Sequence, residues 1–114
     1  SATQLHQWQE DGFLIIPDFL SATQMAQLKQ RATELRDEFN PNEHPVSLFS
    51  TENEQNRDAY FLSSGDKIRY FFEEACYKEG KLQCAPREAI NKVGHGLHLH
   101  DPVYRQVSQS TEIQ

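Results

Sequence analysis

The stretch AINKVGHGLHLHDPVY, residues 89–104, contains the clearest local structure signals in the chain. Its first six residues set the basic Lys92 among apolar neighbours, which predicts a strand over 89–94. Two glycines follow, and they permit a tight turn of the backbone. Asp101 and Pro102 then predict the start of a helix, because Asp is favoured as the N-terminal cap and Pro at the first helical position. The stretch therefore predicts a strand, a turn and a helix in succession.

Three histidines and an aspartate fall within seven residues of this stretch, at His95, His98, His100 and Asp101. Imidazole and carboxylate groups are common metal ligands, so a metal site on one irregular turn is one interpretation. However, Asp101 is needed as a helix cap, and only isolated histidines lie elsewhere in the chain. We therefore expect the histidines to form hydrogen bonds, or to pack, in a junction between strand and helix.

Two helices are predicted in the N-terminal third of the chain. The tetrapeptide SATQ occurs at residues 1–4 and again at 21–24, and Ser followed three residues later by Gln is the pattern of a capping box. The first helix should end at Gly12, a residue suited to the left-handed conformation after a helix. The second should run for some 17 residues with one apolar stripe, formed by Met25, Leu28, Ala32, Leu35 and Phe39.

Short apolar and aromatic runs predict the strands. The run FLII at residues 13–16 predicts a buried strand, and a second strand over 68–72 should be buried on both faces because its aromatic residues are consecutive. The segment SSGDK, which spans 63–67, predicts a plain turn rather than a phosphate-binding loop, since it has a single glycine. KEGK at 78–81 predicts a hairpin tip, and the polar residues 40–58 predict a long connection.

The composition predicts one small domain with a thin core. The chain has 114 residues, of which 37% are hydrophobic, and a net charge of -6. No cluster of Lys and Arg is present, which argues against nucleic acid or an anionic membrane surface as a partner. No apolar run approaches the roughly 18 residues of a membrane helix, and the polar start does not resemble a signal peptide. We expect residues 1–114 to be one part of a larger domain, in a longer protein.

The two cysteines, Cys76 and Cys84, are too few for a disulfide framework, and their spacing matches no zinc motif. We expect two small, partly buried side chains. Together with the absence of an export signal, they favour a reducing compartment, and hence the cytoplasm.

Three motifs, DGFLIIPDFLS (11–21), YFLSSGDKIRYFFE (60–73) and INKVGHGLHLHDPVY (90–104), resemble the phytanoyl-CoA dioxygenase family in order and spacing. The resemblance implies a non-haem Fe(II)- and 2-oxoglutarate-dependent oxygenase on a double-stranded β-helix, the jelly-roll or cupin-like barrel. It predicts an α+β segment that holds the N-terminal helices and the strands that extend the main sheet, with most of the barrel outside residues 1–114.

The resemblance implies that the full protein hydroxylates a small organic substrate and releases succinate and CO₂. The iron ligands of such enzymes are a His-x-Asp pair and a distant His, and no His-x-Asp occurs in this sequence. We therefore expect this segment by itself to be inactive, with the remainder of its own chain as its partner. The alternative is a truncated or non-catalytic member of the family that acts as a binding or interaction module.

The resemblance assigns one functional residue. The family's corresponding lysine lines the 2-oxoglutarate pocket, and here it is Lys92, whose ammonium could face a dicarboxylate. The alternative is a surface lysine whose stem lies along apolar neighbours. His95 follows three residues later, which leads to the hypothesis that it borders the same pocket.

Overall fold

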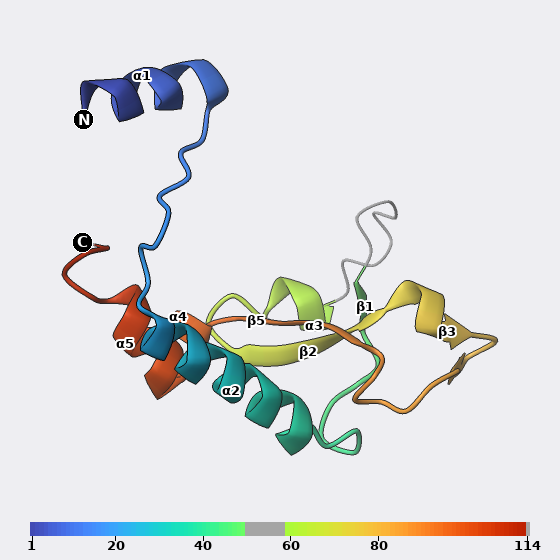
Figure 1. Cartoon of the computed structure of the whole chain (residues 1–114). Coiled ribbons are helices and arrows are strands. Elements are labelled where there is room, and N and C mark those ends of the chain that lie inside the picture. The colour runs from blue at the N-terminus through green and yellow to red at the C-terminus, as the bar shows by residue number, and fades with distance from the viewer. Residues whose placement is uncertain (50–58, 114) are drawn as a thin grey trace.

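The computed structural model describes residues 1–49 and 59–113, which form a mixed α+β structure (Figure 1). In chain order the elements are α1 (Ala2–Asp11), α2 (Ala22–Glu38), β1 (Leu48–Phe49), α3 (Ala59–Leu62), β2 (Ile68–Glu73), the 3₁₀ helix η2 (Glu74–Cys76), β3 (Tyr77–Lys78), β4 (Lys81–Leu82), β5 (Ile90–His95), α4 (Leu97–His100) and α5 (Pro102–Ser108). None of the described helices is long and apolar enough to cross a membrane.

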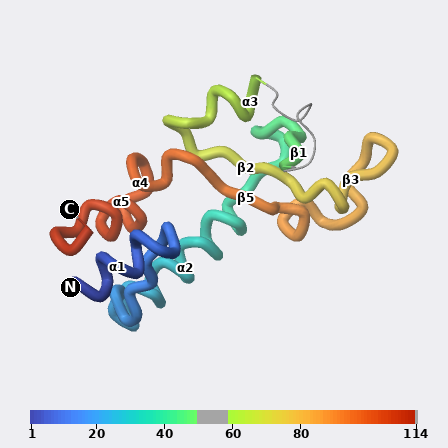
Figure 2. Tube along the Cα trace, turned by 90° about the horizontal axis from the view of Figure 1, so that it is seen from above, coloured from blue at the N-terminus to red at the C-terminus, as the bar shows by residue number. Residues whose placement is uncertain are grey.

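The centre of the structure is a three-stranded sheet of order β1-β2-β5. β2 and β5 are antiparallel, with Tyr70 opposite Val93 and Phe71 opposite Lys92, whereas β1 runs parallel to β2. Seen from above, α2 and α3 lie on opposite sides of this sheet (Figure 2). The strands β3 and β4 form a separate hairpin, as residues 78–81 predicted.

The strand β2 is buried on both faces, as its consecutive aromatic residues predicted. Tyr70, Phe71 and Phe72 are 7%, 0% and 2% exposed. On the α2 side, the rings of Tyr70 and Phe72 lie 4.8 and 5.6 Å from that of Phe39. On the α3 side, the Phe71 ring lies 5.5 Å from that of Phe61. Each face of one short strand therefore holds its own layer of the core.

Both predicted capping boxes are present. The hydroxyl of Ser1 accepts the backbone N–H of Gln4 at 3.2 Å, and Ser21 accepts that of Gln24 at the same distance. Gly12 follows α1 in the left-handed conformation with φ of 74°, and α2 has the predicted 17 residues. Local sequence signals therefore fix both helix starts.

The predicted buried strand at 13–16 is wrong. This segment has no regular structure, and Phe13, Ile15 and Ile16 are 55%, 69% and 50% exposed. A strand depends on pairing with a neighbour, and no described strand lies beside this segment, which spans the space between α1 and the rest of the structure (Figure 1). Apolar and β-branched residues alone were therefore not enough to predict a strand at 13–16.

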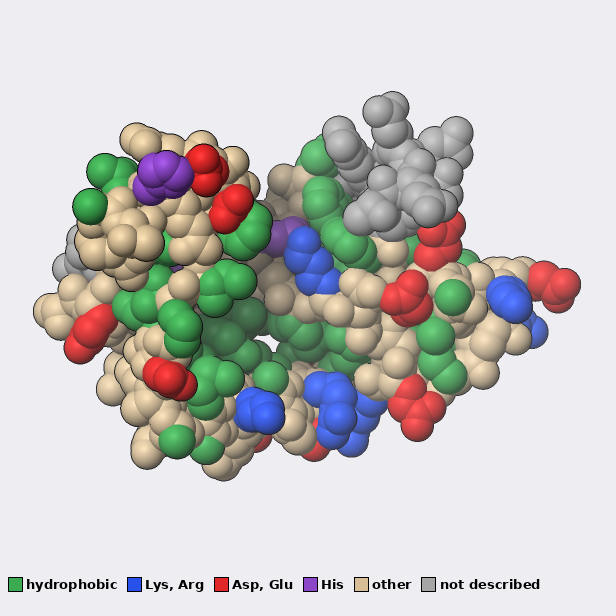
Figure 3. Space-filling model, turned by 45° about the horizontal axis from the view of Figure 1, so that its top comes forward, with side chains coloured by type: hydrophobic (Ala, Val, Ile, Leu, Met, Phe, Trp, Pro, Cys, Tyr) green, Lys and Arg blue, Asp and Glu red, His purple; other side chains and the backbone are tan. Residues whose placement is uncertain are grey.

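The apolar stripe of α2 is buried only at its C-terminal end. Leu35 and Phe39 are 5% and 3% exposed, whereas Met25 is 45% exposed and Ala32 also lies at the surface. The radius of gyration is 17.3 Å, against about 13 Å for a compact domain of this length. Figure 3 shows a hollow near the middle of one face of the molecule, and hydrophobic side chains gather around it. The core is thus confined to the sheet and the helix surfaces that cover it.

The polar connection predicted over 40–58 falls partly outside the described residues. Its described part contains a turn over 41–43 and the short strand β1. The apolar patch from Val46 to Phe49 therefore contributes the third strand of the sheet, through Leu48 and Phe49.

Candidate functional site

Lys92 lies in β5, inside the strand predicted for residues 89–94. It stands opposite Phe71 and on the same face of the sheet, the face covered by α3. Its half-buried side chain places Nζ 4.6 Å from the ring centroid of Phe49 and 6.0 Å from that of Phe61. These are cation–π distances, so aromatic rings from β1 and α3 hold the ammonium group above the sheet.

A β-bulge turns Lys92 toward this face. Phe71 pairs with Lys92 but Phe72 pairs with Ile90, so Asn91 is an extra residue in β5. In a regular strand, residues 90 and 92 would point to the same side. Here Ile90 packs with Val93 against the core on the α2 side, and Lys92 is on the opposite side. Asn91 itself donates a hydrogen bond to Glu73 Oε2.

No ion pair within residues 1–49 and 59–113 includes Lys92. A half-buried ammonium without a carboxylate partner favours an anionic ligand, because burying a charge without compensation is costly. An ammonium next to aromatic rings provides the charge and the hydrogen-bond donors that a carboxylate needs. The chemistry of this face therefore fits one end of a dicarboxylate.

His95, at the end of β5, is fixed on the same face by Ser64. The Ser64 hydroxyl donates to the backbone carbonyl of Phe61 at 2.5 Å, and His95 Nδ1 lies 2.7 Å from the same oxygen. Since the single hydroxyl proton is already donated, Nδ1 of His95 carries the proton and donates to Ser64. Nε2 is then left with a lone pair that can accept a hydrogen bond.

The surroundings of His95 favour its neutral form. Burial lowers the pKa of the imidazole, and the positive charge of Lys92 lowers it further, against a smaller opposing effect of the Ser64 backbone. The imidazole ring also packs 5.4 Å from Phe61 and 5.6 Å from Phe71. On this face β5 therefore presents a cation, Lys92, and a neutral acceptor, His95.

The remaining histidines of the junction face other groups. His100 Nε2 lies 2.6 Å from the carbonyl oxygen of Asp66, and His98 is exposed. The junction is tight, because a Cβ at Gly96 would lie 3.0 Å from the backbone nitrogen of Lys67. The expected hydrogen bonding within a strand-to-helix junction is confirmed for His95 and His100. The part of the chain that the structure describes holds no group of three or more His, Cys, Asp or Glu residues placed for a metal ion.

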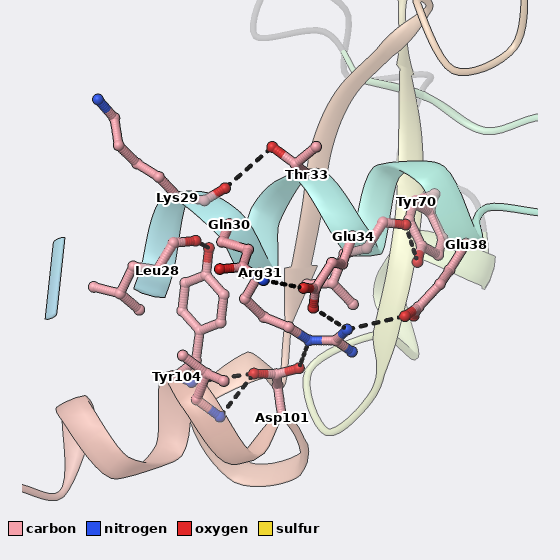
Figure 4. A network of polar contacts seen from close by, with 12 residues as sticks. Leu28, Lys29, Gln30, Arg31, Thr33, Glu34, Glu38, Tyr70, Asp101 and Tyr104 are labelled. Carbon is pink, nitrogen blue, oxygen red and sulfur yellow. Dashed lines mark hydrogen bonds and ion pairs between the residues drawn. The ribbon is translucent and has the colours of Figure 1, made fainter. Parts of the chain in front are cut away.

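Asp101 performs the predicted capping role and also forms a buried ion pair (Figure 4). Its Oδ1 accepts the backbone N–H groups of Val103 and Tyr104 at 3.0 and 3.1 Å. Its Oδ2 accepts Arg31 Nε at 2.6 Å, and the carboxylate side chain is 1% exposed. Arg31 lies on α2, so this pair ties α2 to the start of α5, immediately after the histidine junction.

Arg31 is surrounded by further carboxylates of its own helix. Its Nη1 lies 3.2 Å from Glu34 and 3.0 Å from Glu38. Hydrogen bonding to Asp101 is the main cause that raises the pKa of Arg31. Burial opposes ionisation of Asp101, but the hydrogen bonds from Arg31 and from the backbone of Tyr104 and Val103 outweigh it and lower the pKa of this carboxyl.

Sequence reasoning placed Lys92, His95 and Asp101 correctly on their elements but missed the partners that fix them. Ser64 lies in the segment predicted to be a plain turn, 31 residues before His95. Arg31 lies 70 residues before Asp101. Neither spacing carries a local signal. The spacing of three between the core residues of β5 could have indicated the bulge, since a regular strand repeats every two residues.

Comparison with known proteins identifies the family. A model of the family "Phytanoyl-CoA dioxygenase (PhyH)" matches residues 8–113. The chain is 42% identical over 120 residues to "Phytanoyl-CoA dioxygenase domain-containing protein 1" of Mus musculus, covering 100% of this chain and 41% of the mouse protein. "Phytanoyl-CoA dioxygenase domain-containing protein 1 homolog" of Dictyostelium discoideum is 41% identical over 111 residues, covering 96% of this chain and 39% of that relative. "Phytanoyl-CoA dioxygenase" of Arabidopsis thaliana is 38% identical over 111 residues, with 96% and 38% covered.

The chain belongs to the phytanoyl-CoA dioxygenase family. The resemblance in its three motifs is therefore confirmed. The chain is 42% identical to the mouse and rat forms of "Phytanoyl-CoA dioxygenase domain-containing protein 1". The family has a cupin-like jelly-roll fold; the described residues contribute helices and a few strands to it, without a closed barrel. The chain spans about 41% of the length of the mouse relative.

We predict that Asp101→Ala destabilises the full-length protein by about 3–5 kcal/mol, because it leaves the Arg31 charge without its buried partner. Asp101→Asn should cost less, since the amide oxygen still caps α5. The folded-state pKa of Asp101 lies below the unfolded value of about 3.9, so its contribution is complete above that value and lost as pH falls through the folded pKa. Thermal unfolding at pH 7 and pH 3 measures both effects.

Asp37→Asn is the matched control, because the Asp37 carboxylate is 48% exposed and pairs with Arg36 on the surface of α2. It should change the stability by less than about 1 kcal/mol. Equal losses at Asp37 and Asp101 would contradict the role of the buried pair.

Proposed function

We propose that the full-length protein is a non-haem Fe(II)- and 2-oxoglutarate-dependent oxygenase with an intact double-stranded β-helix. It hydroxylates a small organic substrate, and 2-oxoglutarate is converted to succinate and CO₂. Residues 1–114 form the N-terminal part of that single domain, in a cytoplasmic protein without a nucleic-acid or membrane partner. Family membership supports the class of reaction. The ammonium of Lys92, which forms no ion pair with any residue that the structure describes, supports the cosubstrate.

Lys92 binds one carboxylate of 2-oxoglutarate in this proposal. The rings of Phe49 and Phe61 hold Nζ on one face of the sheet, so little side-chain entropy remains to be lost when the ligand binds. The aromatic neighbours shield part of the ammonium from water, which strengthens its attraction to a carboxylate. His95 Nε2, as a neutral acceptor, can take a hydrogen bond from a water molecule that donates its other hydrogen to a carboxylate oxygen of 2-oxoglutarate.

The described residues do not fit the iron of this reaction. They hold no suitable cluster of His, Cys, Asp or Glu, and the sequence contains no His-x-Asp. The proposal therefore places the iron ligands outside this sequence, in the full-length protein. When bound, iron supplies the activation of O₂. The role of the present residues is to bind and orient the cosubstrate.

We expect the full-length protein, supplied with Fe(II), ascorbate and 2-oxoglutarate, to release succinate. Binding of 2-oxoglutarate is measured in the same samples, because it does not require the identity of the prime substrate. Succinate is measured by mass spectrometry, and a sample without Fe(II) is the control. Absence of both succinate and 2-oxoglutarate binding would overturn the proposal and favour a non-catalytic binding module.

We predict that Lys92→Met raises the KM for 2-oxoglutarate about tenfold to a hundredfold, because a hydrogen bond to a charged group contributes about 1.5–3 kcal/mol. Lys92→Arg should recover part of this loss, since the guanidinium keeps the charge but not the geometry. The measurement is succinate release over a series of 2-oxoglutarate concentrations.

The matched control is Lys81→Met, which removes the same charge from the exposed strand β4. Its KM should equal that of the wild type. An unchanged KM in Lys92→Met, with the protein folded, would show that Lys92 is a surface lysine and not a ligand of the cosubstrate.

For His95 we predict a smaller effect, because its neutral Nε2 can reach the acceptor oxygens of 2-oxoglutarate only through a bridging water molecule. His95→Ala should raise the KM for 2-oxoglutarate about fivefold with little change in kcat, which corresponds to the loss of one such hydrogen bond of about 1 kcal/mol. Ser64→Ala leaves the imidazole but frees its Nδ1, so it should give part of the same increase. An unchanged KM in His95→Ala would leave His95 with a packing role only.

A further inference from the structure

Cys76 and Cys84 lie at the two ends of the β3–β4 hairpin, away from the face that carries Lys92. The ladder pairs Tyr77 with Leu82, and the next residues continue it, because the backbone N–H of Gln83 donates to the carbonyl of Cys76 at 2.8 Å. Cys84 follows Gln83 directly. The backbone therefore brings the two cysteines close together across the base of the hairpin.

The side chains of both cysteines reach the same surroundings. Both are free and half-buried, and both pack against the core cluster that contains Phe39 and Phe72. Interaction with the Cys76 side chain, together with burial, raises the pKa of the Cys84 thiol. The two sulfur atoms are therefore neighbours.

We propose that Cys76 and Cys84 are a peroxide-sensitive dithiol that forms a reversible intramolecular disulfide. The thiolate of Cys76 attacks one oxygen of hydrogen peroxide, the O–O bond breaks, and Cys76 becomes a sulfenic acid as water leaves. The sulfur of Cys84 then attacks the Cys76 sulfur, loses its proton and displaces a second water molecule. Two thiols are oxidised by two electrons, and one peroxide is reduced to two waters.

The roles of the two sulfurs follow from their contacts. The thiolate is the reactive form, and contact with Cys76 favours the protonated thiol of Cys84, so the proposal assigns the first reaction to Cys76 and the resolving step to Cys84. The hairpin tip between them has positive φ at Glu79 and Gly80, which makes a tight turn and keeps the two ends together. This proposal does not depend on the oxygenase activity.

The sequence offers a direct test, because trypsin cuts between the two cysteines. Cleavage after Arg69, Lys78, Lys81 and Arg87 separates residues 70–78, which contain Cys76, from residues 82–87, which contain Cys84. The folded full-length protein is treated with a small molar excess of hydrogen peroxide, remaining thiols are blocked with N-ethylmaleimide, and the digest is analysed by mass spectrometry. We expect the two peptides as one linked species, two hydrogens lighter than their sum, that dithiothreitol separates.

Two variants and one labelling experiment make the result decisive. In Cys84→Ser, the 70–78 peptide should carry a sulfenic acid that dimedone traps, and no linked species should form. In Cys76→Ser, the 82–87 peptide should remain a maleimide adduct. Mixing ¹⁵N-labelled and unlabelled protein before oxidation should give no linked pair of mixed label. Recovery of both peptides as maleimide adducts in the wild type, or mixed-label pairs, would overturn the proposal.

Discussion

The position of Lys92 depends on one irregularity in the pairing of β5 with β2. The bulge at Asn91 lets Ile90 and Val93 share the core face although they are three residues apart. It also turns the intervening Lys92 to the face covered by α3. Without the bulge, Lys92 and Ile90 would share one side, and either the lysine would enter the core or the isoleucine would leave it. The bulge thus lets the core pack and at the same time places Lys92, which is proposed to bind the cosubstrate, on the opposite face.

The buried pair of Arg31 with Asp101 then fixes the position of the helix beyond β5. A buried ion pair adds little stability in itself, because desolvation of the two charges offsets their attraction. It is, however, specific in geometry: the carboxylate must cap α5 through Oδ1 while it accepts Arg31 through Oδ2 (Figure 4). α5 therefore starts at one defined place beside α2. The junction that contains His95 and His100 is held at one end by β5 in the sheet and at the other by the start of α5.

The sequence predicted those features whose causes are local. The capping boxes at Ser1 and Ser21, the Asp101 cap and the hairpin tip each depend on residues within a single turn, and all are confirmed. The strand predicted at 13–16 failed because a strand depends on a neighbour that no local pattern reveals. The same limit explains why Ser64 and Arg31 were missed as partners. Lys92 was assigned through family resemblance, and its aromatic surroundings came only from the structure.

The half-buried cations of the described residues, Arg31, Arg69 and Lys92, differ in their partners. The Arg69 guanidinium donates to the carbonyl of Tyr60 and the hydroxyl of Ser63. Arg31 faces Asp101, Glu34 and Glu38, so its charge is more than balanced inside the protein. Lys92 has aromatic rings around it and no carboxylate among its described neighbours, although the chain as a whole carries a net charge of -6. A partly buried lysine that forms no ion pair within residues 1–49 and 59–113 has a charge that a ligand can still meet. An anion from solution can satisfy that charge, and this is the reason for proposing a carboxylate of the cosubstrate as the ligand of Lys92.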